Sequence, residues 1–405
     1  MRSIRLGVIF DQLVKSGGGY QQALSSALLT RKLPKELVEV VYFTLFKENV
    51  SILAAHGIHA ELINLSFFEK VRNKLRGKIT NRYFFKLIKK IEKYSPFEKN
   101  LIDHQIDLVY FLSPISLQES LENLNYITTL WDLCHRDEPE FPEVRQNKEF
   151  EWRDESYKKI LPRATAILVD SEIGKTNTAH RYGINLDRIY VMPFQPAEAI
   201  RGKMDFKVNQ KLKISEKFNV GKYIFYPAQF WSHKNHVYLL EGLFLLEQRY
   251  GLQISVIFSG TDKGNKKYID SYAHKLKIED RVHYAGFVSD NEMIELYSQS
   301  IALVMPSYFG PTNLPPLEAF QLGTPVLYPD KRGLRDQVGD AALLIDLKDP
   351  NSMALHLKNL IEKKQVREQL ISSGYARLKY LDAIDRVEII KNIIEDFRWK
   401  RSCWS

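Results

Sequence analysis

The sequence contains very little cysteine and no long run of apolar residues. Its 405 residues include only Cys134 and Cys403, so we expect no disulfide framework, in agreement with a reducing compartment. The longest apolar runs, such as residues 301–305, are far shorter than the roughly 20 residues that span a bilayer. The first apolar run is broken by Asp11 and lacks the small-residue cleavage site of a signal peptide. We therefore expect a cytosolic protein without a transmembrane helix.

Several common catalytic motifs are also absent from the sequence. There is no G-x-S-x-G nucleophile elbow, no G-x-x-x-x-G-K-[ST] phosphate loop, no H-E-x-x-H metal motif and no closely spaced pair of cysteines. No cluster of acidic residues indicates a site for a divalent ion. We therefore expect no metal and no cofactor, and the sequence gives no support to a serine hydrolase, a P-loop NTPase or a zinc hydrolase.

Positive charge is in excess and is concentrated in one segment. The formal net charge is +9, which suits a nucleic acid, an anionic lipid or a phosphorylated substrate. Nine Lys or Arg residues and no acidic residue occur between positions 70 and 90, interleaved with apolar residues at roughly helical spacing. For residues 65–90, this pattern predicts one of two structures. One is an interfacial helix on an anionic membrane surface, and the other is an amphipathic helix packed on its own domain with a solvated basic face. No nucleic-acid-binding pattern accompanies this charge, so we expect no nucleic-acid partner.

Strand-like and helix-like segments alternate along the chain. A length of 405 residues suggests two domains, and a content of 44% hydrophobic and 26% charged residues is typical of a soluble globular protein. The expected strands are residues 4–10, 38–43, 108–111, 126–130 and 166–170, followed by 223–227, 254–259, 282–286 and 301–305. Polar, irregular residues 194–221 separate the two series. The pattern predicts an α/β fold with two doubly wound parallel sheets.

Residues 304–328 have the order strand, polar loop, helix start and strand. Gly310 and Pro311 end the first strand, and Asn313 can cap a helix that has prolines in its first turn. Free amides at such a helix start attract anions. Glu318 lies one turn into the helix, where a carboxylate is suited to accept hydrogen bonds from two ribose hydroxyls. The alternative is a solvated helix glutamate.

This stretch resembles the donor-site motif of the group 1 retaining glycosyltransferases, which have the GT-B fold. The family pattern is E-G-F-G-L-P-x-L-E-A-x-x-x-G-x-P-V. The matching residues are Leu314, Pro315, Leu317, Glu318, Ala319, Gly323, Pro325 and Val326. Gly310 stands where the family has its first glutamate, so the resemblance implies that backbone amides, Thr312 or Asn313 contact the donor sugar instead.

The resemblance also implies the arrangement of the domains. Residues 1–193 would form a Rossmann-like domain on the acceptor side, and residues 194–221 a linker. Residues 222–382 would form the Rossmann-like domain that binds a nucleotide sugar. The last helix, within residues 383–405, would cross back to the first domain.

A second segment, residues 226–236, resembles the family's G-R-L-x-x-x-K-G motif. Lys234 matches the lysine that grips the donor diphosphate, and a compact ammonium group is suited to stabilise a leaving phosphate. Gln229 stands where the family has arginine and supplies only a dipole. His233 is either a substitute for that arginine or a solvated surface histidine.

Residues 131–142 follow an expected strand, where family members often have His-Asp. Trp131 takes the place of the histidine and Asp132 that of the aspartate, while His135 follows four residues after Trp131. We predict Asp132 and His135 as catalytic residues together with Lys234. The alternatives are that Asp132 caps the following turn and that His135 belongs to a surface ion network.

Glycines mark two further places where backbone could approach a ligand closely. Gly18 and Gly19 belong to a triple glycine after the first strand, and the resemblance implies that this loop reaches toward the donor phosphates and the acceptor. Gly260 ends a strand of the second half, near the expected base and ribose, and the G-F-V-S sequence from Gly286 resembles a segment that borders the base.

The function implied by the resemblance is retaining, metal-independent transfer of a hexose. The donor would be a nucleotide-diphosphate sugar and the acceptor a saccharide, lipid-linked, in bacterial O-antigen or capsule assembly at the inner face of the cytoplasmic membrane. Two alternatives stay open: a catalytically reduced GT-B subunit that binds nucleotide sugar, and a UDP-sugar epimerase of the same fold. The base, sugar, acceptor and linkage do not follow from the sequence.

Overall fold

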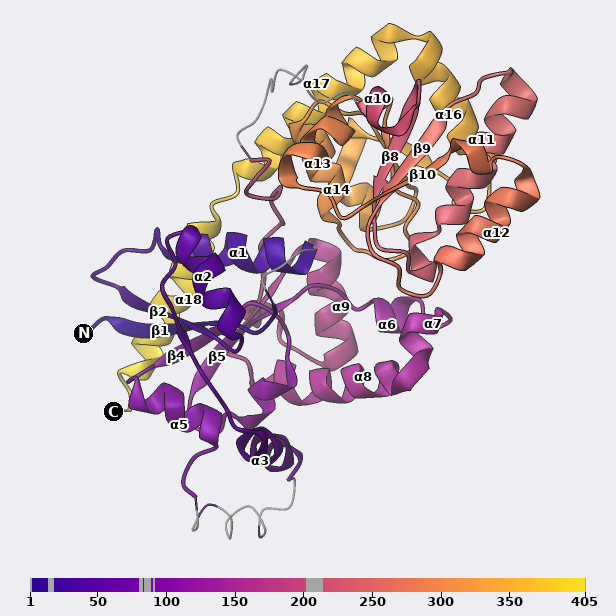
Figure 1. Ribbon diagram of the computed structural model, residues 1–405. Coiled ribbons are helices and arrows are strands. Elements are labelled where there is room, and N and C mark those ends of the chain that lie inside the picture. The colour runs from indigo at the N-terminus through magenta and orange to yellow at the C-terminus, as the bar shows by residue number, and fades with distance from the viewer. Residues whose placement is uncertain are drawn as a thin grey trace. The chain divides into compact units, whose positions relative to one another are not determined.

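The computed structural model describes residues 2–13, 18–79, 83, 89, 92–201 and 214–404. The chain forms two compact units (Figure 1). Unit 1 contains residues 1–133, 150–193 and 385–405, and unit 2 contains residues 134–149 and 194–384. Of the positions discussed above, Gly17 of the triple glycine, residues 202–213 of the linker and part of the basic segment lie outside the described residues.

Unit 1 is built around a parallel sheet of seven strands in the order β3-β2-β1-β4-β5-β6-β7. The strands are β1 (Ile4–Phe10), β2 (Val38–Thr44), β3 (Ala60–Leu62), β4 (Leu108–Phe111), β5 (Asn125–Leu130), β6 (Ala166–Val169) and β7 (Ile189–Val191). The helices are α1 (Gly18–Thr30), α2 (Lys47–Ala55), α3 (Phe67–Lys78), α5 (Pro96–Asp103), α8 (Glu149–Ile160), α9 (Glu172–Tyr182) and α18 (Arg386–Arg401). Short 3-10 turns are η1 (Ser116–Ser120), η3 (Leu161–Arg163) and η4 (Leu186–Arg188).

Both faces of this sheet are covered. Along β1, Val8 packs in a cluster with α1 and α18, whereas its neighbour Ile9 packs in a second cluster with α5 and β4. Successive side chains of a strand point to opposite faces, so the two clusters lie on the two sides of the sheet. Figure 1 shows α18 beside β1 and β2, and its residues Ile390 and Phe397 are buried in the first cluster.

Unit 2 has a parallel sheet of six strands in the order β10-β9-β8-β11-β12-β13. The strands are β8 (Tyr223–Pro227), β9 (Ser255–Ser259), β10 (Val282–Gly286), β11 (Leu303–Val304), β12 (Val326–Pro329) and β13 (Leu343–Ile345). Its longer helices are α11 (His236–Tyr250), α12 (Lys266–Leu276), α13 (Asp290–Ser298), α14 (Leu314–Gln321), α16 (Pro350–Glu362) and α17 (Lys364–Asp382). Shorter pieces are α6 (Cys134–Asp137), α7 (Pro142–Arg145), η2 (Gln146–Lys148), α10 (Ile214–Phe218), η5 (Ser232–Lys234), η6 (Glu279–Arg281), α15 (Leu334–Val338) and η7 (Gly339–Ala341).

The α/β class with two doubly wound parallel sheets is confirmed. One boundary differs from the prediction, because residues 134–149 belong to unit 2 although they lie within the 1–193 range assigned to the first domain. The reason is a set of contacts that this segment makes with the loops of unit 2, described below. Within the described residues, no helix is long and apolar enough to cross a membrane.

Candidate functional site

The two loops with the predicted donor-site motifs leave neighbouring strands of unit 2. In the sheet order, β9 flanks β8 on one side and β11 flanks it on the other, so β8 and β11 lie where the strand order reverses. In open parallel sheets, ligands bind outside the carboxyl ends of the strands at such a switch point. The β8 loop carries Gln229 and Lys234, and the β11 loop carries residues 305–313. The fold therefore brings both motifs to one edge of the sheet.

Lys234 is held by its backbone at the end of η5. Its N–H bonds to the carbonyl of Trp231 at 3.2 Å, and its own carbonyl accepts a hydrogen bond from the Tyr226 hydroxyl at 3.0 Å. Asn235 then adopts a left-handed conformation with φ of 54° before α11 begins. Gln229 is exposed and accepts a hydrogen bond from the indole N–H of Trp231 at 3.0 Å.

His233 is buried, so its interpretation as a solvated surface histidine is wrong. Its backbone N–H donates to the Glu143 carboxylate at 2.9 Å, and its ring Nδ1 bonds the same carboxylate. The ring stacks on Phe309 with centroids 3.8 Å apart and planes inclined by 5°. Although burial would raise the pKa of Glu143, the hydrogen bonds from His233 keep it below its ordinary value.

The β11 loop is fixed from within by Asn313. Its side-chain amide donates to the carbonyl of Phe309 at 3.1 Å and to the Tyr328 hydroxyl at 2.7 Å, while its N–H donates to the Gln337 side chain at 3.0 Å. Asn313 occupies the N-cap position of α14, but its side chain makes no capping hydrogen bond, contrary to the prediction. The competing acceptors in the loop hold the side chain away from the helix start.

The other loop positions differ in exposure. Leu314 is buried at the first position of α14, whereas Thr312 is half-buried. At Gly310, a Cβ atom would lie 2.8 Å from Cδ2 of Leu334, so that side chain would have to move. The Gly310 carbonyl accepts a hydrogen bond from the Cys134 thiol at 2.9 Å. At the position where the family has its first glutamate, the loop therefore packs against Leu334 of α15.

Glu318 is half-buried and its carboxylate is hydrogen-bonded, so the alternative that it is a solvated helix glutamate is wrong. Its carboxylate accepts a hydrogen bond from the Tyr297 hydroxyl at 2.9 Å, and it also bonds the backbone of Ala197. Burial raises the pKa of Glu318 to about 7, against the lowering effect of these hydrogen bonds. Near neutral pH this carboxyl group therefore exchanges a proton, and a ligand that donates hydrogen bonds would favour its ionised form.

Gly260 is required by close backbone packing. Its φ is +148°, and a Cβ atom there would lie 2.4 Å from the carbonyl oxygen of Ala228 in the β8 loop. Because the clash is with backbone, no larger residue fits without a shift of the loop. Gly260 thus sets the distance between the loops after β8 and β9.

A second group of polar residues lies at the carboxyl edge of unit 1. Asp11 follows β1 and accepts a hydrogen bond from Ser113, which follows the neighbouring strand β4. Burial raises the pKa of Asp11 to about 6. A Cβ atom at Gly19, in the first turn of α1, would lie 2.8 Å from the ring of Trp131. Asp11 was not predicted as a candidate site residue, although a polar residue directly after a buried strand is a usable signal.

The remaining predicted residues are less closely grouped. Gly18 is the first residue of α1. Asp132, in unit 1, pairs with Arg153 of α8 at 2.7 Å. His135, in unit 2, lies in α6 and is fully buried, so it is not part of a surface ion network. Among the described residues, no group of three His, Cys, Asp or Glu side chains could hold a metal ion.

Two parallel sheets of this kind, each with helices on both faces, make up the GT-B fold. Residues 208–377 match the model of the family "Glycosyl transferases group 1". The structure of Anabaena Alr3699/HepE in complex with UDP-glucose is similar, with a TM-score of 0.67 and 16% identity over 98% of this chain and all of that chain.

Two curated relatives are bacterial enzymes. The O-antigen chain mannosyltransferase B of Escherichia coli is 25% identical over 247 residues, which cover 59% of this chain and 62% of that protein. The O-antigen chain mannosyltransferase RfbU of Salmonella typhimurium strain LT2 is 27% identical over 203 residues, which cover 50% of this chain and 53% of that protein. The matches therefore span between half and two thirds of the length of these relatives.

Proposed function

We propose that the protein is a retaining glycosyltransferase that moves a hexosyl group from a nucleotide-diphosphate sugar to a saccharide in bacterial surface polysaccharide assembly. The main support is the placement of Lys234 and the β11 loop at the switch point of unit 2. The two relatives named as O-antigen mannosyltransferases support the setting and the hexose.

The residues of unit 2 suit the chemistry of the donor. Lys234 and the amides at the start of α14 would face the diphosphate and stabilise the negative charge that builds on it as the bond to the sugar breaks. Glu318 would accept hydrogen bonds from the ribose. The acceptor oxygen would form its bond to the sugar carbon on the face that the phosphate leaves, and its proton would pass to a phosphate oxygen. Since these groups already provide positive charge, we propose transfer without a metal.

The proposal is tested by transfer of a labelled sugar. The wild-type protein would be incubated with labelled UDP-, GDP-, dTDP- and ADP-sugars and a bacterial membrane-lipid extract, with Lys234→Ala as the matched variant. We expect label in the lipid fraction with one donor, and a large loss of it in the variant. If no label entered the lipid fraction with any donor, the result would favour the catalytically reduced subunit. The packing of Gly310 against Leu334 also favours that alternative. Conversion of the donor without any acceptor would favour the epimerase.

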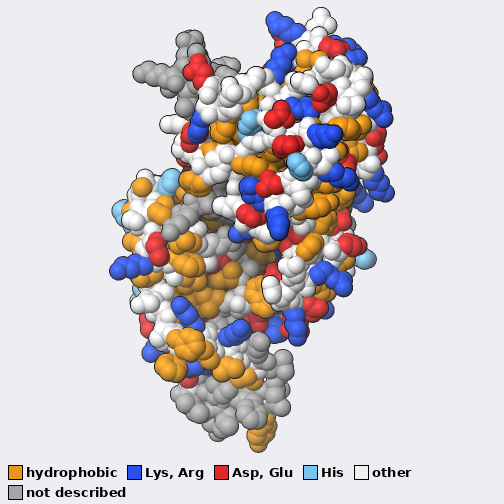
Figure 2. Space-filling model, turned by 45° about the vertical axis from the view of Figure 1, so that its right-hand side comes forward, with side chains coloured by type: hydrophobic (Ala, Val, Ile, Leu, Met, Phe, Trp, Pro, Cys, Tyr) orange, Lys and Arg blue, Asp and Glu red, His pale blue; other side chains and the backbone are white. Residues whose placement is uncertain are grey.

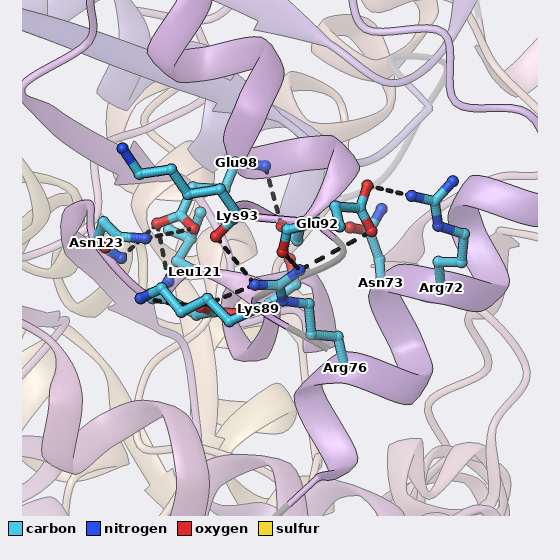
Figure 3. Close-up of polar contacts among 12 residues, drawn as sticks. Arg72, Asn73, Arg76, Lys89, Glu92, Lys93, Glu98, Leu121 and Asn123 are labelled. Atoms are coloured by element: carbon cyan, nitrogen blue, oxygen red, sulfur yellow. Dashed lines mark hydrogen bonds and ion pairs between the residues drawn. The ribbon is translucent and has the colours of Figure 1, made fainter. Parts of the chain in front are cut away.

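The acceptor is proposed to be lipid-linked because of the surface that α3 presents. The buried face of α3 is polar: Arg76 binds the Glu122 carboxylate and the carbonyls of Glu92 and Lys93, and Asn73 accepts a hydrogen bond from the N–H of Phe97 (Figure 3). The opposite face is apolar and exposed. It consists of Phe67, Phe68, Val71 and Leu75, with Lys70 and Lys74 exposed between them.

Such a helix is the reverse of an ordinary surface helix, whose apolar side faces the protein. An apolar patch with basic side chains around it is visible in the lower part of Figure 2, beside the grey residues. The reading of residues 65–90 as a helix whose apolar stripe packs on its own domain is therefore wrong for the described part. We propose that this face rests on the anionic inner surface of the cytoplasmic membrane, where exposed aromatic and basic residues are both favoured.

A further inference from the structure

Residues 134–149 touch three loops at the carboxyl edge of the unit 2 sheet. Glu143 bonds His233 in the β8 loop, and Phe141 packs on Tyr308 and Phe309 in the β11 loop. The Cys134 thiol donates a hydrogen bond to the carbonyl of Gly310 in the same loop. After β12, Lys331 forms an ion pair with Glu138 and donates to the carbonyl of Tyr308 at 2.7 Å. This segment therefore spans the loops that contain the candidate donor residues.

The contact between Glu143 and His233 is the most restrictive of these. The Glu143 carboxylate accepts a hydrogen bond from the backbone N–H of His233 at 2.9 Å and also bonds the ring Nδ1 of the same residue. The side chains of both residues are about nine-tenths buried, with 10% and 9% of their surface exposed. Hydrogen bonds to a buried carboxylate are stronger than those between neutral groups. The position of His233 is therefore set by a residue that is distant in the sequence.

The restraint continues into Lys234. The carbonyl of His233 accepts a hydrogen bond from the N–H of Tyr308 at 2.9 Å, so the peptide groups on both sides of His233 are fixed. The Lys234 carbonyl is in turn fixed by Tyr226. The backbone at Lys234 thus has little freedom, so the side chain that carries the ammonium group begins at a fixed Cα atom.

We propose that Glu143 is a positioning residue that acts through His233 to place the Lys234 ammonium group against the diphosphate of the donor. This inference rests on the proposed function. Because Gln229 stands where the family motif has arginine, Lys234 is the remaining cation of that motif, and its placement matters more than in a motif with two cations. The Glu143 carboxylate itself does not contact the donor.

A double-mutant cycle measured by nucleotide binding tests this inference. The probe is whichever of UDP, GDP, dTDP and ADP binds the wild-type protein, and its dissociation constant is measured by calorimetry for Glu143→Ala, Lys234→Ala and the double variant. We expect Glu143→Ala to weaken binding about tenfold. The double variant should bind no more weakly than Lys234→Ala alone, because the effect of Glu143 passes through Lys234. Glu143→Gln, which still accepts the backbone N–H, should recover part of the loss.

Two matched variants separate positioning from a general loosening of the segment. Glu140→Ala removes an exposed carboxylate from the same segment, and Glu138→Gln removes the ion pair with Lys331 without touching His233. Both should bind the nucleotide as the wild type does, and melting temperatures would show that each variant is folded. Additive losses in the cycle, or an equal loss in Glu138→Gln, would overturn the inference. A wild-type protein that bound none of the nucleotides would instead overturn the proposed function on which it rests.

Discussion

Replacing Glu318 by glutamine should stabilise the free protein at alkaline pH and weaken its binding of a nucleotide. Burial raises the pKa of this carboxyl group from 4.5 to about 7, so the folded protein holds the proton more tightly than the unfolded chain does. The cost of ionising Glu318 is therefore absent below pH 4.5, grows as the pH rises and levels off above about 7. Glutamine resembles the protonated form and does not bear this cost.

The size of the effect follows from the shift. One pKa unit corresponds to about 1.4 kcal/mol, so a rise from 4.5 to about 7 gives an upper limit of about 3.5 kcal/mol at pH 8 to 9. For a unit of this size, such a difference raises the melting temperature by several degrees. Nucleotide binding should weaken about tenfold, because the amide replaces a charged acceptor for the ribose hydroxyls.

Differential scanning calorimetry between pH 4.5 and 9 would measure the first effect, and titration with the bound nucleoside diphosphate the second. Glu368→Gln is the matched control, since that residue is an exposed helix glutamate paired with Lys364. It should change neither quantity. If Glu318→Gln melted like the wild type at every pH, the carboxylate would not be destabilised by burial. If it bound the nucleotide equally well, Glu318 would not contact the ribose.

Three further predictions concern unit 1. Changing Phe67 and Phe68 to serine should weaken co-sedimentation with anionic liposomes by tenfold or more, since burial of an aromatic side chain contributes about 1.5 to 3 kcal/mol; equal recovery of both proteins would remove the membrane proposal. Gly19→Ala should lower the melting temperature, because its Cβ would press on Trp131, and an unchanged melting curve would show that the ring moves freely. Asp11→Asn should raise the melting temperature at pH 8 and leave the nucleotide affinity constant, because burial raises the pKa of Asp11 to about 6 and makes its ionisation costly in the folded protein. A lower melting temperature of the variant at pH 8 would contradict this cost of ionising Asp11.

The sequence predicted the sheets well where strands are fully buried. The expected range 4–10 coincides with β1, and 223–227 coincides with β8, because buried parallel strands are continuous apolar runs bounded by turn residues. The strands β3, β7 and β13 escaped prediction, since each has only three residues and is partly exposed at the edge of its sheet. Short edge strands carry too few residues for a periodic pattern.

The sequence predicted parts of the candidate site and missed others for a physical reason. The β8 and β11 motifs could be recognised because each is local in the sequence. Glu143 could not, because its partner His233 is 90 residues away. For α3 the periodicity showed an apolar stripe but not which face is buried. That choice depends on Glu122, which is 46 residues from Arg76 and draws it inward.

The central claim, that unit 2 binds a nucleoside diphosphate through Lys234, is tested most directly by a thermal-shift panel. UDP, GDP, dTDP and ADP and their common sugar conjugates would be compared on the wild-type protein and on Lys234→Ala. A ligand at 100 times its dissociation constant adds about 2.7 kcal/mol of stability. We predict a shift that is selective for one base in the wild type and much smaller in the variant. A flat panel, or an equal shift in both proteins, would contradict the account.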